Sequence, residues 1–143
     1  MDQEHIRSGR FIHDVLLRRA EDAVNKIPEL WREDKRIHPV LLLWPTTDVK
    51  AQRGERHSGV VFSELPASAA ERLPFIKKAV EGCNAYAVLV VEEVPGAVRA
   101  IFESEHGTET WRLPIKDHGG VRVLGVAARS SNTESVGVRW HDN

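Results

Sequence analysis

Apolar residues alternate with polar ones through the C-terminal half of the chain, and this alternation constrains the fold more than any other feature. It predicts strands over residues 85–92, 98–104, 109–115, 121–129 and 136–141, joined by connections of hairpin length that contain Gly, Asn or Asp. The first of these strands is apolar on both sides, so we expect it to lie centrally. The pattern therefore predicts an antiparallel meander of four or five strands.

Pairing about the turns predicts which residues of the meander face one another. Symmetric closure of the first two turns places Phe102 between Leu89 on one neighbouring strand and Trp111 on the other. Closure of the third turn places Leu113 opposite Val123. Because all five residues are apolar, one face of the meander is predicted to belong to the core.

The N-terminal half predicts two helical segments. Residues 6–30 place apolar side chains at three- and four-residue steps, and Pro28 should restart the helix in a new first turn. Residues 67–81 have helical composition. Pro74 should confine the regular helix to the part that starts beside it, and Gly82 is the expected end.

Two further strands, residues 40–44 and 59–63, flank the polar loop 48–58. Taken together, the pattern predicts one α+β domain over residues 1–143, with an antiparallel or mixed sheet and both helical segments packed on one face. A content of 41% hydrophobic and 29% charged residues agrees with a globular chain of this length.

Charge and cysteine content argue against several classes of protein. Lys and Arg (20) nearly cancel Asp and Glu (21), so the net charge of -1 gives no general attraction to nucleic acid or to a membrane surface. The apolar runs 40–44 and 85–91 are far shorter than the roughly 20 residues that span a bilayer, and the polar N-terminus lacks a secretory signal. With Cys83 as its single cysteine the chain cannot form an intramolecular disulfide, which is typical of a reducing, cytoplasmic compartment.

The face of the meander opposite the predicted core combines one arginine per strand with apolar residues. These interface candidates are Arg99, Ile101, Arg112, Arg122, Leu124, Val126 and Arg139. A row of arginines can bind nucleic-acid phosphates, but Glu92 opposite Arg99 neutralises part of the charge. Arginine mixed with apolar groups is typical of an interface with a second copy or another protein. The alternative is that a helix of the same chain covers these residues.

A second set of residues offers cationic and acid/base groups for an anionic ligand. These ligand-binding candidates are Lys50, Arg53, Arg56 and His57 in the polar loop, and His106 and His118 in predicted turns. No phosphate-binding loop, GxSxG motif or metal-ligand spacing of histidines occurs in the chain. The sequence therefore leaves the catalytic residues unknown, and it predicts no metal and no cofactor.

The absence of a catalytic pattern favours a non-enzymatic cytoplasmic protein that acts by protein–protein interaction and forms a homodimer through its sheet. The first alternative is a small enzyme or anionic-ligand-binding domain that uses loop 50–57 with a turn histidine. The second is nucleic-acid binding through the arginine-bearing face, against which the near-neutral charge argues.

Overall fold

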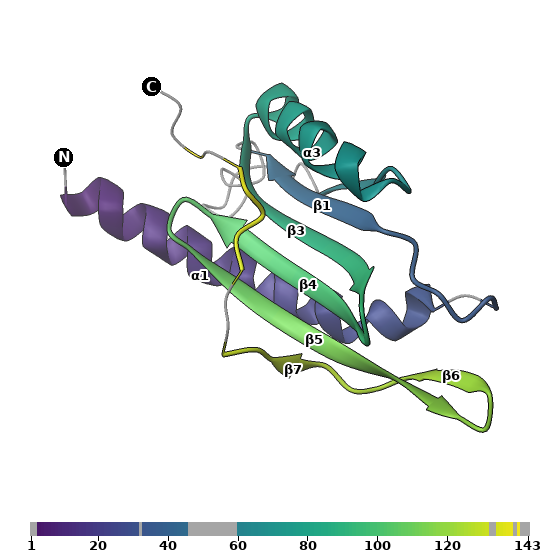
Figure 1. The fold of residues 1–143 in the computed structure, drawn as a ribbon. Coiled ribbons are helices and arrows are strands. Elements are labelled where there is room, and N and C mark those ends of the chain that lie inside the picture. Colours follow the sequence, from purple (N-terminus) through teal and green to yellow (C-terminus); the bar gives the residue numbers. More distant parts are fainter. Residues whose placement is uncertain (1–2, 32, 46–59, 132–133, 139, 141–143) are drawn as a thin grey trace.

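The computed structural model describes residues 3–31, 33–45, 60–131, 134–138 and 140. Within them the elements are α1 (Gln3–Asn25), η1 (Ile27–Leu30), β1 (Val40–Pro45), β2 (Val61–Glu64), α3 (Ala69–Cys83), β3 (Ala85–Val94), β4 (Ala97–Ser104), β5 (Gly107–His118), β6 (Val121–Leu124) and β7 (Ala128–Arg129). These strands form one sheet in the order β2-β1-β3-β4-β5-β6, with β7 on β5, and each pair is antiparallel (Figure 1). The predicted α+β class and four-stranded C-terminal meander are confirmed.

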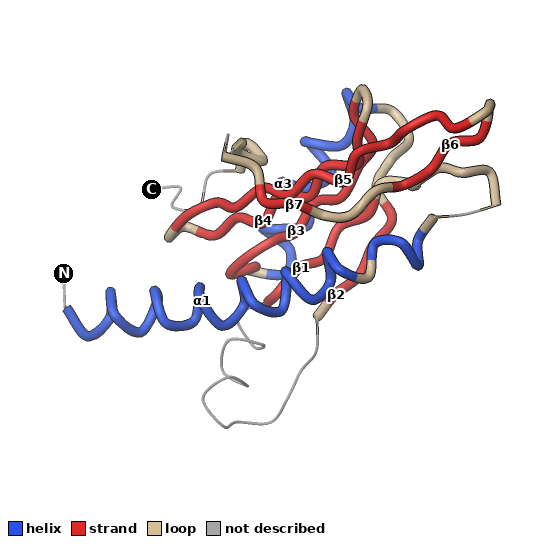
Figure 2. The backbone as a smooth tube through the Cα atoms, turned by 90° about the horizontal axis from the view of Figure 1, so that it is seen from below, coloured by secondary structure: helices blue, strands red, loops and turns tan. Residues whose placement is uncertain are grey.

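The two helices cover opposite faces of the sheet, as Figure 2 shows, rather than sharing one face as expected. Leu16 of α1 belongs to a buried cluster with Leu89 and Phe102. Ile76 of α3 belongs to a separate cluster with Val88. Because neighbouring residues of a strand point to opposite faces, β3 contributes to both cores and is buried on both sides.

The observed helix boundaries agree closely with the predicted ones around Pro28 and less closely at α3. Pro28 lies in the first turn of η1, as predicted. Helix α3 continues through Pro74 and ends at Cys83, and Asn84, with a left-handed φ of 49°, supplies the cap expected from Gly82. Pro74 removes one helical hydrogen bond, but Ile76 and Val80 beyond it are buried against the sheet. None of the described helices is long and apolar enough to cross a membrane.

The register of the first turn is confirmed and that of the second is wrong by two residues. Leu89 pairs with Phe102 as predicted, but Trp111 pairs with Ala100. The second turn is shorter than symmetric closure assumed, because pairing already begins at Ser104 opposite Gly107. A shift of two residues keeps every side chain on its face, so the predicted core is preserved.

The third turn changes which residues share a face. Gly119 and Gly120 have φ values of 61° and 85°, typical of a two-residue hairpin turn, and set Ile115 opposite Leu124. The predicted Leu113–Val123 pair is therefore wrong. The odd shift moves Leu124 to the face covered by α1, where it packs against the core that contains Leu113.

The C-terminal segment, residues 134–140, is the largest departure from the predicted meander. Its described residues form no strand. Val136 and Trp140 instead pack with α3 on the face opposite α1. The buried Glu103 carboxylate of β4 anchors them, accepting the Val136 N–H at 3.0 Å and the Trp140 Nε1–H at 2.8 Å. A buried carboxylate needs such donors, so the segment crosses the sheet instead of extending it.

Replacing Leu16 with alanine should lower the free energy of unfolding by about 2–5 kcal/mol, because its fully buried side chain would leave a cavity under the sheet. Equilibrium urea unfolding measures this loss. Phe11 on the same helix is 64% exposed, so Phe11→Ala should change stability by less than about 0.5 kcal/mol. Equal losses in both variants would contradict the packing of α1 described above.

Candidate functional site

The predicted interface residues divide between the two faces of the sheet. Arg99, Ile101 and Arg112 lie on the face opposite α1, beneath α3 and the C-terminal segment. Ile101 is only 3% exposed and borders a hollow of about 170 Å³ with Ile76 and Val136. This part of the predicted interface is thus covered by the chain itself, which is the alternative that the sequence left open.

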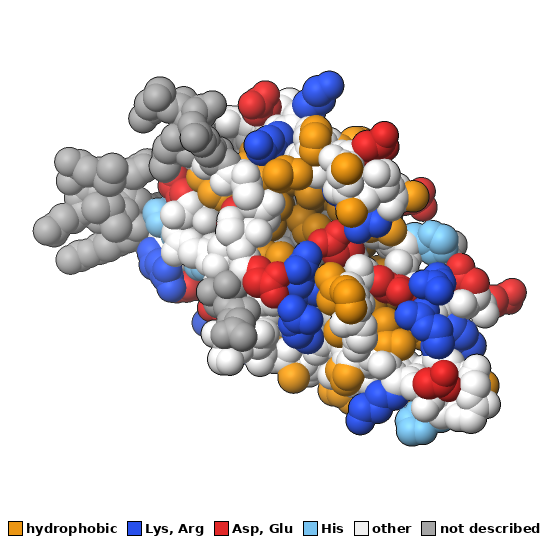
Figure 3. All heavy atoms as spheres, in the orientation of Figure 1, with side chains coloured by type: hydrophobic (Ala, Val, Ile, Leu, Met, Phe, Trp, Pro, Cys, Tyr) orange, Lys and Arg blue, Asp and Glu red, His pale blue; other side chains and the backbone are white. Residues whose placement is uncertain are grey.

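An ion network closes this face. Glu134 binds both Arg99 and Arg112, accepting the Arg112 Nη2–H at 2.8 Å. Glu92 accepts from Arg99 Nη2 at 2.6 Å and from Arg72 Nη1 at 2.7 Å. The hydrogen bond from Arg112, with the charge of Arg99, lowers the pKa of Glu134. Figure 3 shows acidic and basic side chains side by side on this face, so much of its charge is neutralised internally.

Arg122 lies at another part of the molecule. Its guanidinium stands 5.6 Å from the centre of the Trp31 ring and donates to Glu93 Oε2 at 3.1 Å. Burial alone would raise the pKa of Glu93, but hydrogen bonds from Arg122 and from the Ile37 N–H lower it overall. The sequence placed Arg122 on the same face as Arg112. In the structure Arg122 pairs with Asp117 and holds the chain after η1 against β6.

The remaining interface candidates do not form one surface. Leu124 is half-buried against the core under α1, whereas Val126 is 87% exposed. Arg139 lies outside the described residues.

The ligand-binding candidates are dispersed where they are described. His106 precedes β5 and His118 ends it, and a strand of this length separates them by roughly 36 Å. The two turn histidines therefore cannot serve the same pocket. The other four, Lys50, Arg53, Arg56 and His57, lie outside the described residues.

A buried histidine–serine pair joins α1 to the β4–β5 turn, and the sequence analysis missed it. His13 Nδ1 lies 2.5 Å from Ser104 Oγ, which also accepts the His106 N–H at 3.0 Å. Arg10 Nη1 donates to the His106 carbonyl oxygen at 2.8 Å. A serine beside an imidazole is typical of nucleophilic catalysis, but His13 is 2% and Ser104 3% exposed, which closes the hydroxyl to a substrate. We assign the pair to positioning α1.

The edge of the sheet formed by β2 exposes apolar side chains. Phe62 is 55% exposed, and Val60 and Val61 are exposed as well. A hollow of about 340 Å³ adjoins Val60, and Leu42 and Trp44 of β1 line it together with residues of α1. The sequence predicted a strand here but carried no signal that it lies at the edge of the sheet.

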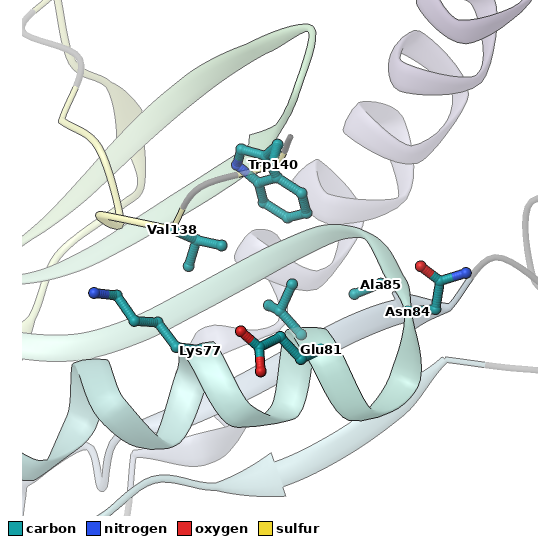
Figure 4. Close-up of a pocket in the computed structure, with 7 residues that line it drawn as sticks. Lys77, Glu81, Asn84, Ala85, Val138 and Trp140 are labelled. Carbon is teal, nitrogen blue, oxygen red and sulfur yellow. The ribbon is translucent and has the colours of Figure 1, made fainter. Parts of the chain in front are cut away.

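A pocket of about 270 Å³ opens between the C-terminal end of α3, the start of β3 and the C-terminal segment (Figure 4). Its lining residues are Lys77, Val80, Glu81, Asn84, Ala85, Val138 and Trp140. It combines apolar walls with one basic and one acidic side chain. None of these residues was a sequence candidate, because they come together only when the C-terminal segment folds back over α3.

The described residues hold no group of three or more His, Cys, Asp or Glu side chains placed to bind a metal ion. Comparison with protein-family models, with curated proteins and with solved structures finds no match. The functional inference therefore depends on the geometry of this chain.

The free energy of unfolding should fall as the pH is lowered from about 6.5 to about 4, because burial, helped by Arg10, lowers the pKa of His13 to about 4. In this window the unfolded chain protonates His13 and the folded chain does not, so acid favours unfolding, by about 3 kcal/mol at pH 4. Urea unfolding at several pH values measures the effect. His13→Gln should flatten this window, and an unchanged pH dependence in that variant would contradict the assignment.

Proposed function

We propose that the chain is a cytoplasmic, non-enzymatic protein that acts by protein–protein contact and self-associates through the edge strand β2. The observation that supports this best is the exposure of Phe62 on that strand. Among the described strands β2 pairs with β1 alone, so it lies at an edge of the sheet. Exposed apolar edge strands are places where sheets of separate chains join.

A second copy of the chain suits this edge because β2 can pair with itself. Two β2 strands that run antiparallel about a two-fold axis at Val61 would form one continuous sheet. In this register Phe62 of the second copy lies opposite Val60, on the face of α1. Val61 meets its own copy on the other face, so apolar side chains meet on both sides.

The hollow beside Val60 adds to the surface that a second copy could contact. Leu42 and Trp44 supply apolar lining, and Asp22 of α1 and Lys26, which follows α1, supply charge. An apolar centre with charged groups around it is typical of protein interfaces. The arginine-bearing face supports the role less well, because α3 and the C-terminal segment cover Ile101.

Sedimentation velocity over a wide range of concentrations tests the proposal. The wild-type chain should form a dimer, and Phe62→Ser should weaken it. Each dimer would bury Phe62 twice, and full burial of such a side chain contributes about 1.5–3 kcal/mol. Because Phe62 is 55% exposed before association, the dissociation constant should rise about tenfold to a few hundredfold.

Val126→Ser is the matched control, because Val126 is also exposed but follows β6 at the other end of the sheet. It should dimerise like the wild-type chain. A wild-type chain that stays monomeric, or a Phe62→Ser variant that dimerises equally well, would reject β2 as the interface.

A further inference from the structure

The pocket in Figure 4 has walls of different chemistry on its two sides. Val138 and Trp140 of the C-terminal segment lie on one side, and Lys77 and Glu81 of α3 lie on the other. Val80, which is buried, adds an apolar surface. A volume of about 270 Å³ is close to the lower end of small-ligand sites. The pocket therefore suits a small molecule that is partly apolar.

The polar edge of the Trp140 indole is already engaged within the protein. Its Nε1–H donates to the buried Glu103 at 2.8 Å, so the polar edge of the ring is occupied. What the ring can still offer a ligand is its π surface, which attracts ammonium groups.

Lys77 and Glu81 stand one helical turn apart, yet within the described residues neither forms an ion pair with the other or with a third residue. The order Lys before Glu is the less favourable one for a pair at this spacing. A ligand with a single charge would meet a like charge at the pocket. A ligand with both charges would satisfy both side chains.

We propose that this pocket binds a free α-amino acid with an apolar side chain. Its ammonium group binds the Glu81 carboxylate beside the Trp140 ring, and its carboxylate binds the Lys77 ammonium. Its side chain packs against Val80 and Val138. This inference is independent of dimer formation at β2, which lies at a different part of the sheet.

Titration of the full chain with L-leucine, followed by the NMR signal of the Trp140 Nε1–H, tests the proposal. Trp140→Phe identifies that signal. Leucine should shift it saturably. The probes 4-methylpentanoate, which lacks the ammonium group, and 3-methylbutylamine, which lacks the carboxylate, should each bind at least about tenfold more weakly. Absence of a saturable shift, or equal binding of either probe, would overturn the proposal.

Variants of Lys77 and Glu81 test whether these two side chains bind the charged groups of leucine. Glu81→Gln and Lys77→Gln should each weaken leucine binding about tenfold, and both residues are exposed, so the fold should be retained. Glu71→Gln and Lys78→Gln are the matched controls, because these residues lie on the same helix but do not line the pocket. Leucine binding that is equal in Glu81→Gln and Glu71→Gln would assign the shift to another site and reject the proposal.

Discussion

The burial of β3 on both of its faces is the constraint on which the rest of the structure depends. Leu89 faces the core under α1, and Val88 and Val90 face the core under α3. Neither side of the apolar run 87–91 within β3 can be left in water. Helix α1 is long enough to cover one face, but α3 covers only part of the other. The C-terminal segment covers the rest of that face. Glu103 of β4 binds it within the core, and its own Glu134 binds Arg99 and Arg112.

The cover that α3 and the C-terminal segment form over this face determines where a partner or ligand can bind. It encloses Ile101 and engages Arg99 and Arg112 in ion pairs, so the face that the sequence favoured as an interface offers little free surface. It also creates a new site, because the pocket beside Trp140 exists only between the segment and α3. An apolar surface that this cover does not reach lies at the β2 edge, around Phe62. The proposed amino-acid site thus follows from the fold of the C-terminal segment, whereas the proposed dimer follows from the position of β2 at an edge of the sheet.

Local patterns predicted the elements well, because alternation and helical spacing report which residues are buried. The strand at Leu89, its pairing with Phe102 and the turn at Pro28 were all predicted correctly. The position of Leu124 was missed, although Gly119-Gly120 is itself a signal for a two-residue turn. Contacts between distant parts of the chain carried no such signal. Nothing in the sequence near Glu134 indicates that it binds two arginines. The pattern of residues 136–140 is equally compatible with a strand of the sheet and with a segment that packs over the sheet.

Amide hydrogen exchange at increasing protein concentration tests most directly whether the chain itself covers the face opposite α1 and whether a second copy pairs with the edge strand β2. The Val136 amide and the Trp140 indole N–H should be protected to the same degree at every concentration, because Glu103 of the same chain binds them. Amides in β2 should gain protection as the concentration rises, since a second strand would pair with them. If protection in β2 stays unchanged and the C-terminal segment is protected only at high concentration, the cover is supplied by a second copy and β2 is not the interface.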